Sequence, residues 1–567
     1  MIKKLFNFYS LLRSLEIKVY IQFTLIIVAT IFETLTIAVF LPLIILLLNQ
    51  SILSGSLLDQ VLKFFNFNNL PLLTSFSIFV IFLFIIKFLY LNFYNYYQSK
   101  FIYGTEKIIS SLLLRKFLSL PLNQIEKEHS SKIINLVTTQ SYRWADFGIK
   151  SIISLIADIF LVSGLIFFLF ILNPIPVIFL SLFIILNIYF LSKFVKNKNF
   201  LWGNQNVNLE QKRLTTLRET FSLLKNIKLH ELNQFYINEF DNITKSSRLL
   251  IAKQHVLNSI PRLLIELMGV IIFIIIILFS GYFFSNKDFN LIPSLAIIGA
   301  SAFRIIPAIG RIQGSLINIQ FALPILDEIY SILKIKEKEI NNNPVKLLSF
   351  NDKIELKNIQ FSYNNNKKIF NNLNLTIKKG KITGIIGPSG SGKSSLVNIL
   401  TGFNNPQKGQ FFIDGKENNF SSKEWRNLIG YVPQSIFISN RSVNENIAIG
   451  IKKESIDHVV IKKILKLSNL ENFVEELPYK TNQIMGENAH NISGGQAQRI
   501  AIARSLYRQP EILIFDESTS SLDVASEDQI LLDLQNLKDL ITIIIVTHRD
   551  NTLKFCDEIY NIEDLDK

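Results

Sequence analysis

Residues 382–400 read Ile-Thr-Gly-Ile-Ile-Gly-Pro-Ser-Gly-Ser-Gly-Lys-Ser-Ser-Leu-Val-Asn-Ile-Leu. The apolar run 382–386 predicts a buried strand, and residues 395–400 predict a helix. Between them lies the pattern G-x-x-x-x-G-K-S, in the strand–loop–helix setting that a phosphate-binding loop requires. This pattern predicts that backbone N–H groups of the loop and of the helix start bind phosphate. We expect Lys393 to contact the β- and γ-phosphates and Ser394 to bind Mg²⁺.

A second segment ends in two acidic residues. It reads Glu511-Ile-Leu-Ile-Phe-Asp516-Glu517, and its four apolar residues predict a buried strand. Such a strand places Asp516 at its carboxyl end, beside the phosphates. We expect Asp516 to hold Mg²⁺, directly or through water, and Glu517 to polarise the attacking water as the general base. An acidic pair beyond a phosphate-binding loop indicates a nucleotide-hydrolysing site.

A third segment, Ile492-Ser-Gly-Gly-Gln496, precedes a predicted helix over residues 497–504. Two glycines and a hydroxyl at a helix start form a second anion-binding device, because the helix dipole adds positive potential there. The chain therefore has two phosphate-binding devices, but one loop lysine and one Asp-Glu pair.

Together these segments resemble the nucleotide-binding domain of ABC transporters, and the whole chain resembles an exporter-type half-transporter. The resemblance implies that Tyr363 stacks on the adenine of ATP. It also implies that Mg²⁺ is held by Ser394, Gln434 and Asp516. The nucleotide-binding residues would be Tyr363 and the loop Gly387, Pro388, Ser389, Gly390, Ser391, Gly392, Lys393, Ser394 and Ser395.

Further roles follow from the same resemblance. Gln434, at the end of Tyr-Val-Pro-Gln, and His548, at the end of Val-Thr-His, would join Glu517 as catalytic residues. Asp523 would belong to the D-loop, and Glu487 lies where exporters have a coupling loop. The signature, which caps ATP bound to the partner subunit, would be Ser493, Gly494, Gly495 and Gln496. Because each chain has one phosphate-binding loop and one signature, the resemblance implies a homodimer, or a heterodimer with a related half. Ile492 replaces the leucine usual in the family.

The composition of the remaining chain indicates a membrane protein. Hydrophobic residues make up 49% and charged residues only 18%, and the mean hydropathy is +0.31, whereas soluble proteins carry about 25% charge. A spanning helix needs about 20 largely apolar residues. The expected fold class is therefore a polytopic α-helical membrane domain fused to an α/β P-loop ATPase domain. The resemblance to exporter-type half-transporters implies that the membrane domain has the type I ABC exporter fold. We expect six spans, over about 21–48, 73–97, 148–172, 175–194, 258–284 and 291–316.

The positive charges indicate the orientation of these spans. Segments 1–18, 98–144 and 195–255 are rich in Lys and Arg, whereas the opposite loops hold only Lys63 and Lys287. Because positive residues stay on the cytoplasmic side, both termini are expected there. This distribution explains the net charge of +14, so we expect no nucleic-acid partner. The single cysteine, Cys556, excludes an intrachain disulfide.

A charged, Asn-rich stretch marks the domain boundary. We expect a transmembrane domain over 1–333, a linker over 334–345 and a nucleotide-binding domain over 346–567. Segment 51–72 is either an amphipathic helix in the outer membrane interface or an ordered loop.

Ionisable residues within the spans indicate the substrate, because such residues usually face an internal cavity or a partner. Arg304 and Arg311 are seven residues apart and therefore share one helix face. With Lys87 and Arg262 they could line a cavity suited to a phosphate or pyrophosphate headgroup. Alternatively, Arg262 pairs with Glu266, or these cations extend to the lipid headgroups or bond helix ends.

The spans also resemble those of the PglK family of bacterial flippases, in residues 33–44, 261–266 and 303–311. That family moves polyprenyl-pyrophosphate-linked oligosaccharides from the cytoplasmic to the outer leaflet of the inner membrane. The resemblance implies an ATP-driven flippase whose partners are membrane lipid and a lipid-linked oligosaccharide. Alternatives are a lipid A or multidrug exporter, and a membrane regulatory module gated by ATP.

Overall fold

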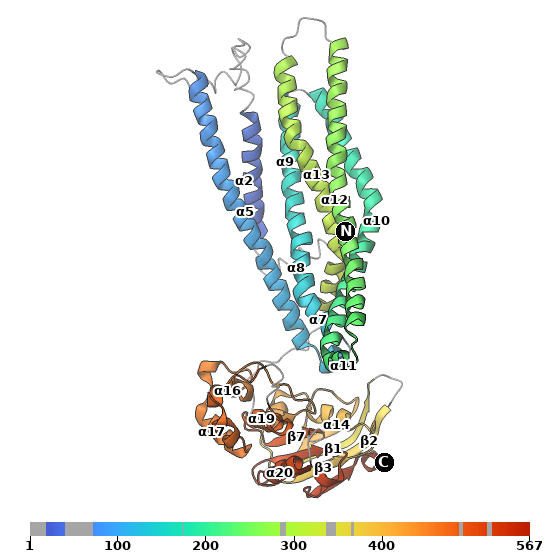
Figure 1. Ribbon diagram of the computed structural model, residues 1–567, viewed down its shortest axis with the longest axis vertical. Helices are drawn as coiled ribbons and strands as arrows, with labels where there is room; N and C mark the ends of the chain where they lie inside the picture. Colours follow the sequence, from blue (N-terminus) through green and yellow to red (C-terminus); the bar gives the residue numbers. More distant parts are fainter. Residues whose placement is uncertain are drawn as a thin grey trace. The chain divides into compact units, whose positions relative to one another are not determined.

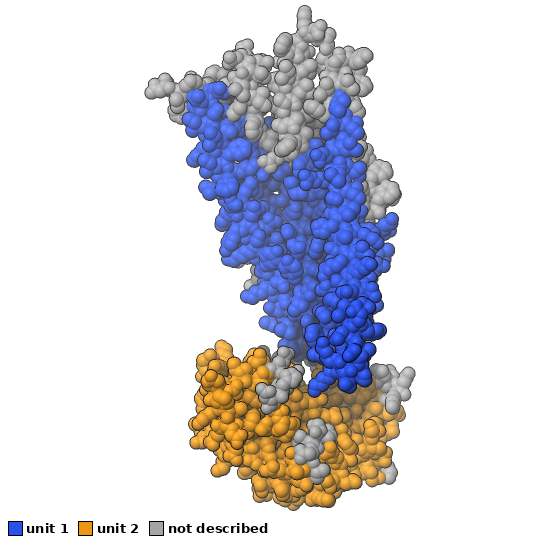
Figure 2. Space-filling model, in the orientation of Figure 1, with its two compact units in different colours: residues 1–120, 128–338 blue, residues 121–127, 339–567 orange. Residues whose placement is uncertain are grey.

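The computed structural model describes residues 19–39, 72–126, 128–172, 174–283, 291–335, 348–363, 368–486, 492–518 and 524–566. The chain divides into two compact units, residues 1–120 with 128–338 and residues 121–127 with 339–567 (Figure 2). Segment 51–71, most of the expected linker, Glu487 and Asp523 lie outside the described residues.

The first unit is built from long helices that run side by side (Figure 1). Within the described chain, four stretches are long and apolar enough to cross a membrane: Val19–Thr36, Leu73–Ser119, Ser130–Phe170 and Ile305–Leu333. Much of the apolar sequence of the expected fourth, fifth and sixth spans falls where side chains are not described. The principal helices are α2 (Val19–Ala38), α5 (Leu72–Ser119), α9 (Lys150–Leu172), α10 (Pro174–Ser222), α12 (Asn233–Phe283) and α13 (Leu291–Leu333).

Helix α13 packs against α9, α10 and α12. Leu165 of α9, Ile265 of α12 and Ile309 of α13 are buried in one apolar cluster. Apolar residues recur at helical spacing on these faces, so each helix presents a stripe to its neighbours. The resulting contacts hold α9, α12 and α13 together, and the polar residues of these helices are positioned by that packing.

The helical stretch before α9 contains two π-helical segments, η2 (Leu136–Gln140) and η3 (Trp144–Ile149), which flank α8 (Ser141–Arg143) and follow α7 (Ser130–Asn135). Trp144 is fully buried, and its ring lies against Gly148, where a Cβ would come within 2.5 Å of it. π-Helical turns are rare and often occur at functional sites. Here η3 supplies Asp146 and Phe147 to a pocket of this unit. The remaining helix among the described residues of this unit is α11 (Leu224–Leu229).

The second unit contains two β-sheets. The antiparallel sheet has the order β2-β1-β4-β5, formed by β1 (Lys353–Ser362), β2 (Lys368–Lys378), β4 (Lys408–Ile413) and β5 (Lys416–Asn418). The parallel sheet has the order β6-β7-β8-β3-β9, formed by β3 (Ile382–Ile386), β6 (Ile429–Val432), β7 (Ile512–Asp516), β8 (Thr542–Val546) and β9 (Glu558–Asn561). The α/β pattern expected from the sequence is therefore confirmed.

Both faces of the parallel sheet are covered, which explains its continuous apolar strands. Successive side chains of a strand point to opposite faces, so Leu513 and Phe515 of β7 enter one core and Ile512 and Ile514 the other. The carboxyl ends of β3, β6, β7 and β8 meet at one edge, where ligands bind in such sheets.

The helices of this unit are α6 (Leu122–Ile125), α14 (Lys393–Leu400), α15 (Lys423–Asn427), α16 (Val443–Ile447), α17 (His458–Leu467), α18 (Glu471–Glu476), α19 (Gly494–Leu506), α20 (Val524–Gln535), α21 (Asp550–Leu553) and α22 (Ile562–Leu565). Short 3₁₀ turns, η4 (Lys453–Ser455) and η5 (Lys480–Asn482), join some of them.

Candidate functional site

The phosphate-binding loop leaves β3 and enters α14. Gly390 and Gly392 have φ values of +84° and +103°, which side chains rarely tolerate. A Cβ at Gly392 would lie 2.8 Å from the Ile369 side chain and 2.9 Å from the Phe370 ring. The loop can therefore adopt its curved path only with glycine at this position.

Lys393 is the first residue of α14, and its side chain is only 6% exposed. Its Nζ donates hydrogen bonds to the carbonyl oxygens of Gly387, at 2.8 Å, and Pro388, at 3.1 Å. The ammonium group is therefore bound inside the loop, where it adds positive charge to the backbone N–H groups.

Glu517 is the point where the predicted catalytic residues meet. Its backbone has φ +45°, and its N–H donates to the carbonyl of Val546 at 2.9 Å. Gln434 Nε2 donates to Glu517 Oε2 at 3.3 Å. Lys393 Nζ lies 3.7 Å from Oε1, and His548 Nδ1 lies 3.6 Å from Oε2. The loop lysine, Gln434, Glu517 and His548, separated by up to 155 positions in the chain, therefore form one cluster.

Asp516 has a neighbour that was not assigned from the sequence. Tyr431 Oη donates a hydrogen bond to Asp516 Oδ2 at 3.1 Å. Burial raises the pKa of Asp516, while the hydrogen bond from Tyr431 and the charge of Lys393 oppose that rise. Burial and the nearby Asp516 also raise the pKa of Tyr431, so this hydroxyl remains a donor at neutral pH. Tyr431 lies in β6, directly before the loop that carries Gln434, and that position could have indicated its role.

Tyr363 presents a ring to solvent beside the phosphate-binding loop. The residue is 44% exposed, and its ring packs edge-on against Phe361 with centroids 5.0 Å apart. Ser395 Oγ donates to Tyr363 Oη at 3.2 Å, so the first turn of α14 fixes the position of the ring. An exposed, fixed aromatic face can stack on a purine base.

The signature residues form the start of α19. Ser493 and Gln496 make a reciprocal capping box, in which the Gln496 N–H donates to Ser493 Oγ at 3.2 Å and the Ser493 N–H donates to Gln496 Oε1 at 3.0 Å. A Cβ at Gly495 would meet no atom closer than 3.9 Å. This helix start is therefore open toward solvent, and it is formed by a different element from the phosphate-binding loop.

The donor atoms fit a magnesium nucleotide. Ser391 Oγ, inside the loop, is buried and has no hydrogen-bond partner in the described part of the chain, so a phosphate oxygen would satisfy it. The described residues contain no cluster of three His, Cys, Asp or Glu side chains that could hold a metal ion by themselves. Mg²⁺ usually takes one or two carboxylates, with phosphate oxygens and water completing its shell, and Asp516 with Ser394 meets that requirement.

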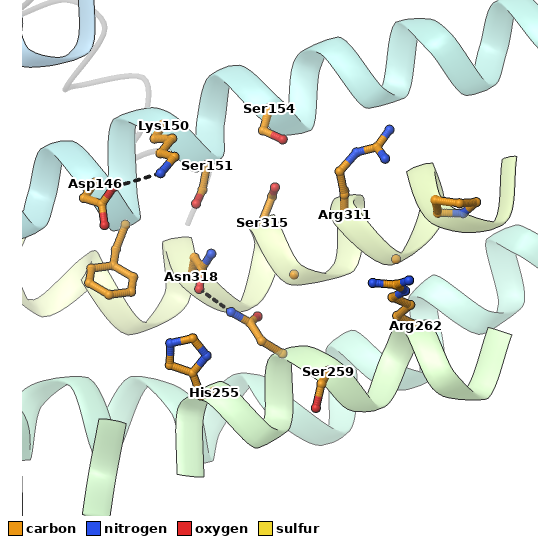
Figure 3. Close-up of a pocket in the computed structure, with 15 residues that line it drawn as sticks. Asp146, Lys150, Ser151, Ser154, His255, Ser259, Arg262, Arg311, Ser315 and Asn318 are labelled. Carbon is orange, nitrogen blue, oxygen red and sulfur yellow. Dashed lines mark hydrogen bonds and ion pairs between the residues drawn. The ribbon is translucent and has the colours of Figure 1, made fainter. Parts of the chain in front are cut away.

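The four cations expected in the membrane spans lie in different surroundings. Lys87 Nζ pairs with Glu33 Oε2 at 2.9 Å and donates to Thr36 Oγ1 at 3.0 Å. The side chain of Arg304 is outside the described set. The remaining two, Arg262 and Arg311, line one pocket of about 620 Å³ between α9, α12 and α13 (Figure 3).

This pocket carries an excess of positive charge. Arg311 binds Asp158 through two nitrogens, with Nε at 2.9 Å and Nη2 at 2.6 Å from Oδ1. Arg262 has no ion pair with any described residue. It therefore does not pair with Glu266, which was one of the alternatives expected from the sequence. The other charged lining residues, Asp146 and Lys150, pair with each other at 3.1 Å. The pocket can therefore attract an anion.

Comparison with known proteins agrees with this organisation. The family described as ABC transporter matches residues 370–520, and the family described as ABC transporter transmembrane region matches residues 22–303. The solved structure of a bacterial Atm1-family ABC exporter with ATP bound has the same fold, with a TM-score of 0.79 over 97% of this chain and 94% of that chain, at 18% identity.

Curated relatives match over part of the chain. The leukotoxin translocation ATP-binding protein LktB of Mannheimia glucosida is 44% identical over 212 residues, 37% of this chain and 30% of that protein. The heterocyst differentiation ATP-binding protein HepA of a Nostoc species is 35% identical over 262 residues, 46% of this chain and 43% of that protein. The chain thus spans less than half the length of these relatives. It is an ABC transporter chain, with a transmembrane region and an ATPase domain on one polypeptide.

Proposed function

We propose that this chain is one half of an ATP-driven flippase. Its substrate is an amphipathic lipid whose headgroup carries phosphate, namely a polyprenyl-pyrophosphate-linked oligosaccharide. It moves from the cytoplasmic to the outer leaflet of the bacterial inner membrane, and both termini of the chain are cytoplasmic. The observation that carries this proposal is the pocket in which Arg262, which has no ion pair with a described residue, lies beside Arg311.

The ATPase cluster supplies the energy for this movement. Tyr363 stacks on adenine, and the backbone of residues 387–395 with Lys393 holds the phosphates. Ser394, Asp516 and Gln434 would hold Mg²⁺, which would supply positive charge to the phosphates. Glu517 accepts the proton of the attacking water. Gln434 and His548, which both lie next to the Glu517 carboxylate, help to orient that water.

Two copies of the chain are needed to complete each nucleotide site. The start of α19 offers an exposed Gly494, a partly exposed Gly495 and a helix dipole, and these features bind phosphate. Because each chain has one such device and one phosphate-binding loop, a homodimer closes two equivalent sites. A heterodimer with a related half would satisfy the same geometry, and Asp523 would lie at the dimer contact.

The pocket favours an anionic headgroup over an apolar drug. Its lining contains two arginines, one lysine and one aspartate, together with serine and asparagine side chains. Arg311 pairs with Asp158 and Lys150 with Asp146, so Arg262 supplies the excess positive charge among the described residues. Arginine is the side chain best suited to bind phosphate through paired N–H groups. A multidrug site would instead be lined mainly by apolar and aromatic side chains. We include Lys87 and Arg304 as substrate residues at other stages of transport, when their surroundings change.

The experiment is a titration of ATPase activity in nanodiscs with a polyprenyl-pyrophosphate-linked oligosaccharide. We expect the lipid to stimulate the wild type, and Arg262→Gln to raise the half-maximal lipid concentration about tenfold or more, because one charge-assisted contact is lost. Lys253→Gln, on the same helix but outside the pocket, is the matched control. Absence of stimulation in the wild type, or equal response of Arg262→Gln and the control, would reject the proposal. Stimulation by lipid A or apolar drugs alone would favour the alternative exporter.

A further inference from the structure

The pocket is longer than a pyrophosphate group requires. Arg262 and Arg311 lie toward one end, and Asp146, Lys150 and His255 lie toward the other (Figure 3). Seven residues separate Arg262 from His255 on α12, which corresponds to about 10 Å along the helix. An anionic group held by the two arginines therefore leaves most of this length for the part of the substrate that follows it.

The part of the pocket beyond the two arginines is polar and carries no unpaired charge among the described residues. It is lined by serine hydroxyls and asparagine amides from three helices, and Lys150, which lies beside Ser151 (Figure 3), is paired with Asp146. The hydroxyl and amide residues are Ser151, Ser154, Asn258, Ser259, Ser315 and Asn318. Groups of this kind bind a neutral ligand that both donates and accepts hydrogen bonds.

Two of these serines make no side-chain hydrogen bond to another described residue. Ser151 is 4% exposed and Ser315 is 6% exposed, yet neither hydroxyl has a hydrogen-bond partner among the described residues. Neither oxygen is among the buried, unpaired atoms of the described residues, so both hydroxyls can be reached from the pocket that they line. Figure 3 shows the two side chains on facing helices of the pocket. Both hydroxyls are therefore available to a ligand that enters between α9 and α13.

Asn318 adds a donor with a fixed orientation. Its Oδ1 accepts two hydrogen bonds at 2.7 Å, one from Gln254 Nε2 and one from Asn258 Nδ2. Because both bonds need the oxygen at that position, the Nδ2 group must lie on the other side of the amide. Asn318 lines the pocket, so its NH₂ group is presented there, one helical turn from Ser315.

We propose that this polar part of the pocket, beyond the two arginines, is a subsite for the sugar residues joined to the pyrophosphate. Sugars are neutral, and their hydroxyls can hydrogen-bond to the hydroxyls of Ser151 and Ser315 and to the NH₂ group of Asn318. The Phe147 ring, which also lines the pocket, adds an apolar face for the C–H side of a sugar. The inference rests on the proposed function, but it concerns a different part of the substrate from the arginine contacts.

The test compares two lipids on the full-length protein in nanodiscs. One is bare polyprenyl pyrophosphate, and the other carries the oligosaccharide. For the double variant Ser151→Ala/Ser315→Ala we expect the half-maximal concentration of the glycosylated lipid to rise about tenfold, and that of the bare lipid to stay unchanged. The matched control is Ser163→Ala/Ser331→Ala, which removes exposed hydroxyls from the same two helices outside the pocket.

Equal shifts for both lipids, or no shift for either, would overturn the sugar subsite while leaving the flippase proposal intact. If neither lipid stimulates the wild type, the proposed function is wrong and the subsite falls with it. A second readout does not depend on ATPase activity. In the double variant Ser315→Cys/Cys556→Ala the introduced thiol is the only one in the chain, and the glycosylated lipid, but not the bare lipid, should slow its alkylation. Equal protection by both lipids would again contradict the subsite.

Discussion

The ion pair between Asp158 and Arg311 should respond asymmetrically to mutation. The Asp158 side chain is 7% exposed, whereas the Arg311 side chain is 52% exposed. Removing the arginine leaves a carboxylate in a site that water barely reaches, with one further hydrogen bond, from Ser154 Oγ at 3.3 Å. Removing the carboxylate leaves a guanidinium that water already reaches. The two single substitutions should therefore lower the free energy of unfolding by very different amounts.

The magnitude follows from the exposure of each partner. Breaking a fully buried pair costs about 3–5 kcal/mol, and exposed pairs contribute about 0–1 kcal/mol. Because Arg311 is half exposed, we expect Arg311→Gln to destabilise the protein by about 2–4 kcal/mol. We expect Asp158→Asn to cost about 1 kcal/mol or less. The double variant should lie close to Asp158→Asn, since the buried charge is then absent.

Thermal unfolding in nanodiscs measures this difference. A change of 1 kcal/mol shifts Tm by about 2–4 °C in domains of 150–250 residues, and by less in larger chains. We therefore expect Arg311→Gln to lower Tm by several degrees and Asp158→Asn by about 1 °C. The control is Lys150→Gln, which breaks an exposed pair with Asp146 and should change Tm little. Equal losses for the two single variants would refute the reasoning from burial.

Three further predictions concern the ATPase unit. Glu517→Gln should bind ATP normally in a fluorescent-nucleotide assay and lose about 10²–10⁴-fold of turnover; near-normal turnover would show that this carboxylate is not the base. Tyr431→Phe removes the hydrogen bond to Asp516 and should raise the Mg²⁺ concentration for half-maximal ATPase activity about tenfold, whereas an unchanged Mg²⁺ requirement would show that Tyr431 only packs. Burial raises the pKa of Asp516 above its ordinary 3.8, so the folded state binds this proton more tightly than the unfolded state. Without Mg²⁺, the contribution of Asp516 to stability should therefore fall as the pH rises from 3.8 through the raised pKa. Asp516→Asn should remove that part of the pH dependence of Tm, and a dependence identical to that of the wild type would contradict the assignment.

The parts of the site carried by local sequence could be predicted. A buried strand, a glycine-rich loop and a helix start fix the backbone around Lys393 through short-range rules. Likewise, Asp516 and His548 follow apolar strands directly, and parallel strands bring their carboxyl ends together. The convergence of these residues with Gln434 on Glu517 follows from the strand order of the sheet.

Contacts between distant helices could not be predicted in the same way. The partners of Lys87 and Arg311 lie 54 and 153 positions away in the chain, and helical spacing shows which face a residue occupies but not what that face meets. Sequence also does not show that the Ser151 and Ser315 hydroxyls lack a hydrogen-bond partner among the described residues, because serines are common in helices that cross membranes. These features depend on how α9, α12 and α13 pack.

The most direct measurement is lipid movement itself. Proteoliposomes containing the full-length chain would be loaded with a fluorescent polyprenyl-pyrophosphate-linked oligosaccharide on the side of the ATPase domain, and its appearance on the opposite leaflet would be followed after Mg²⁺ and ATP are added. We expect movement that requires ATP, stops in Glu517→Gln and is strongly slowed in Arg262→Gln. Rapid ATP hydrolysis without any lipid movement, or lipid movement that continues without ATP, would contradict a flippase.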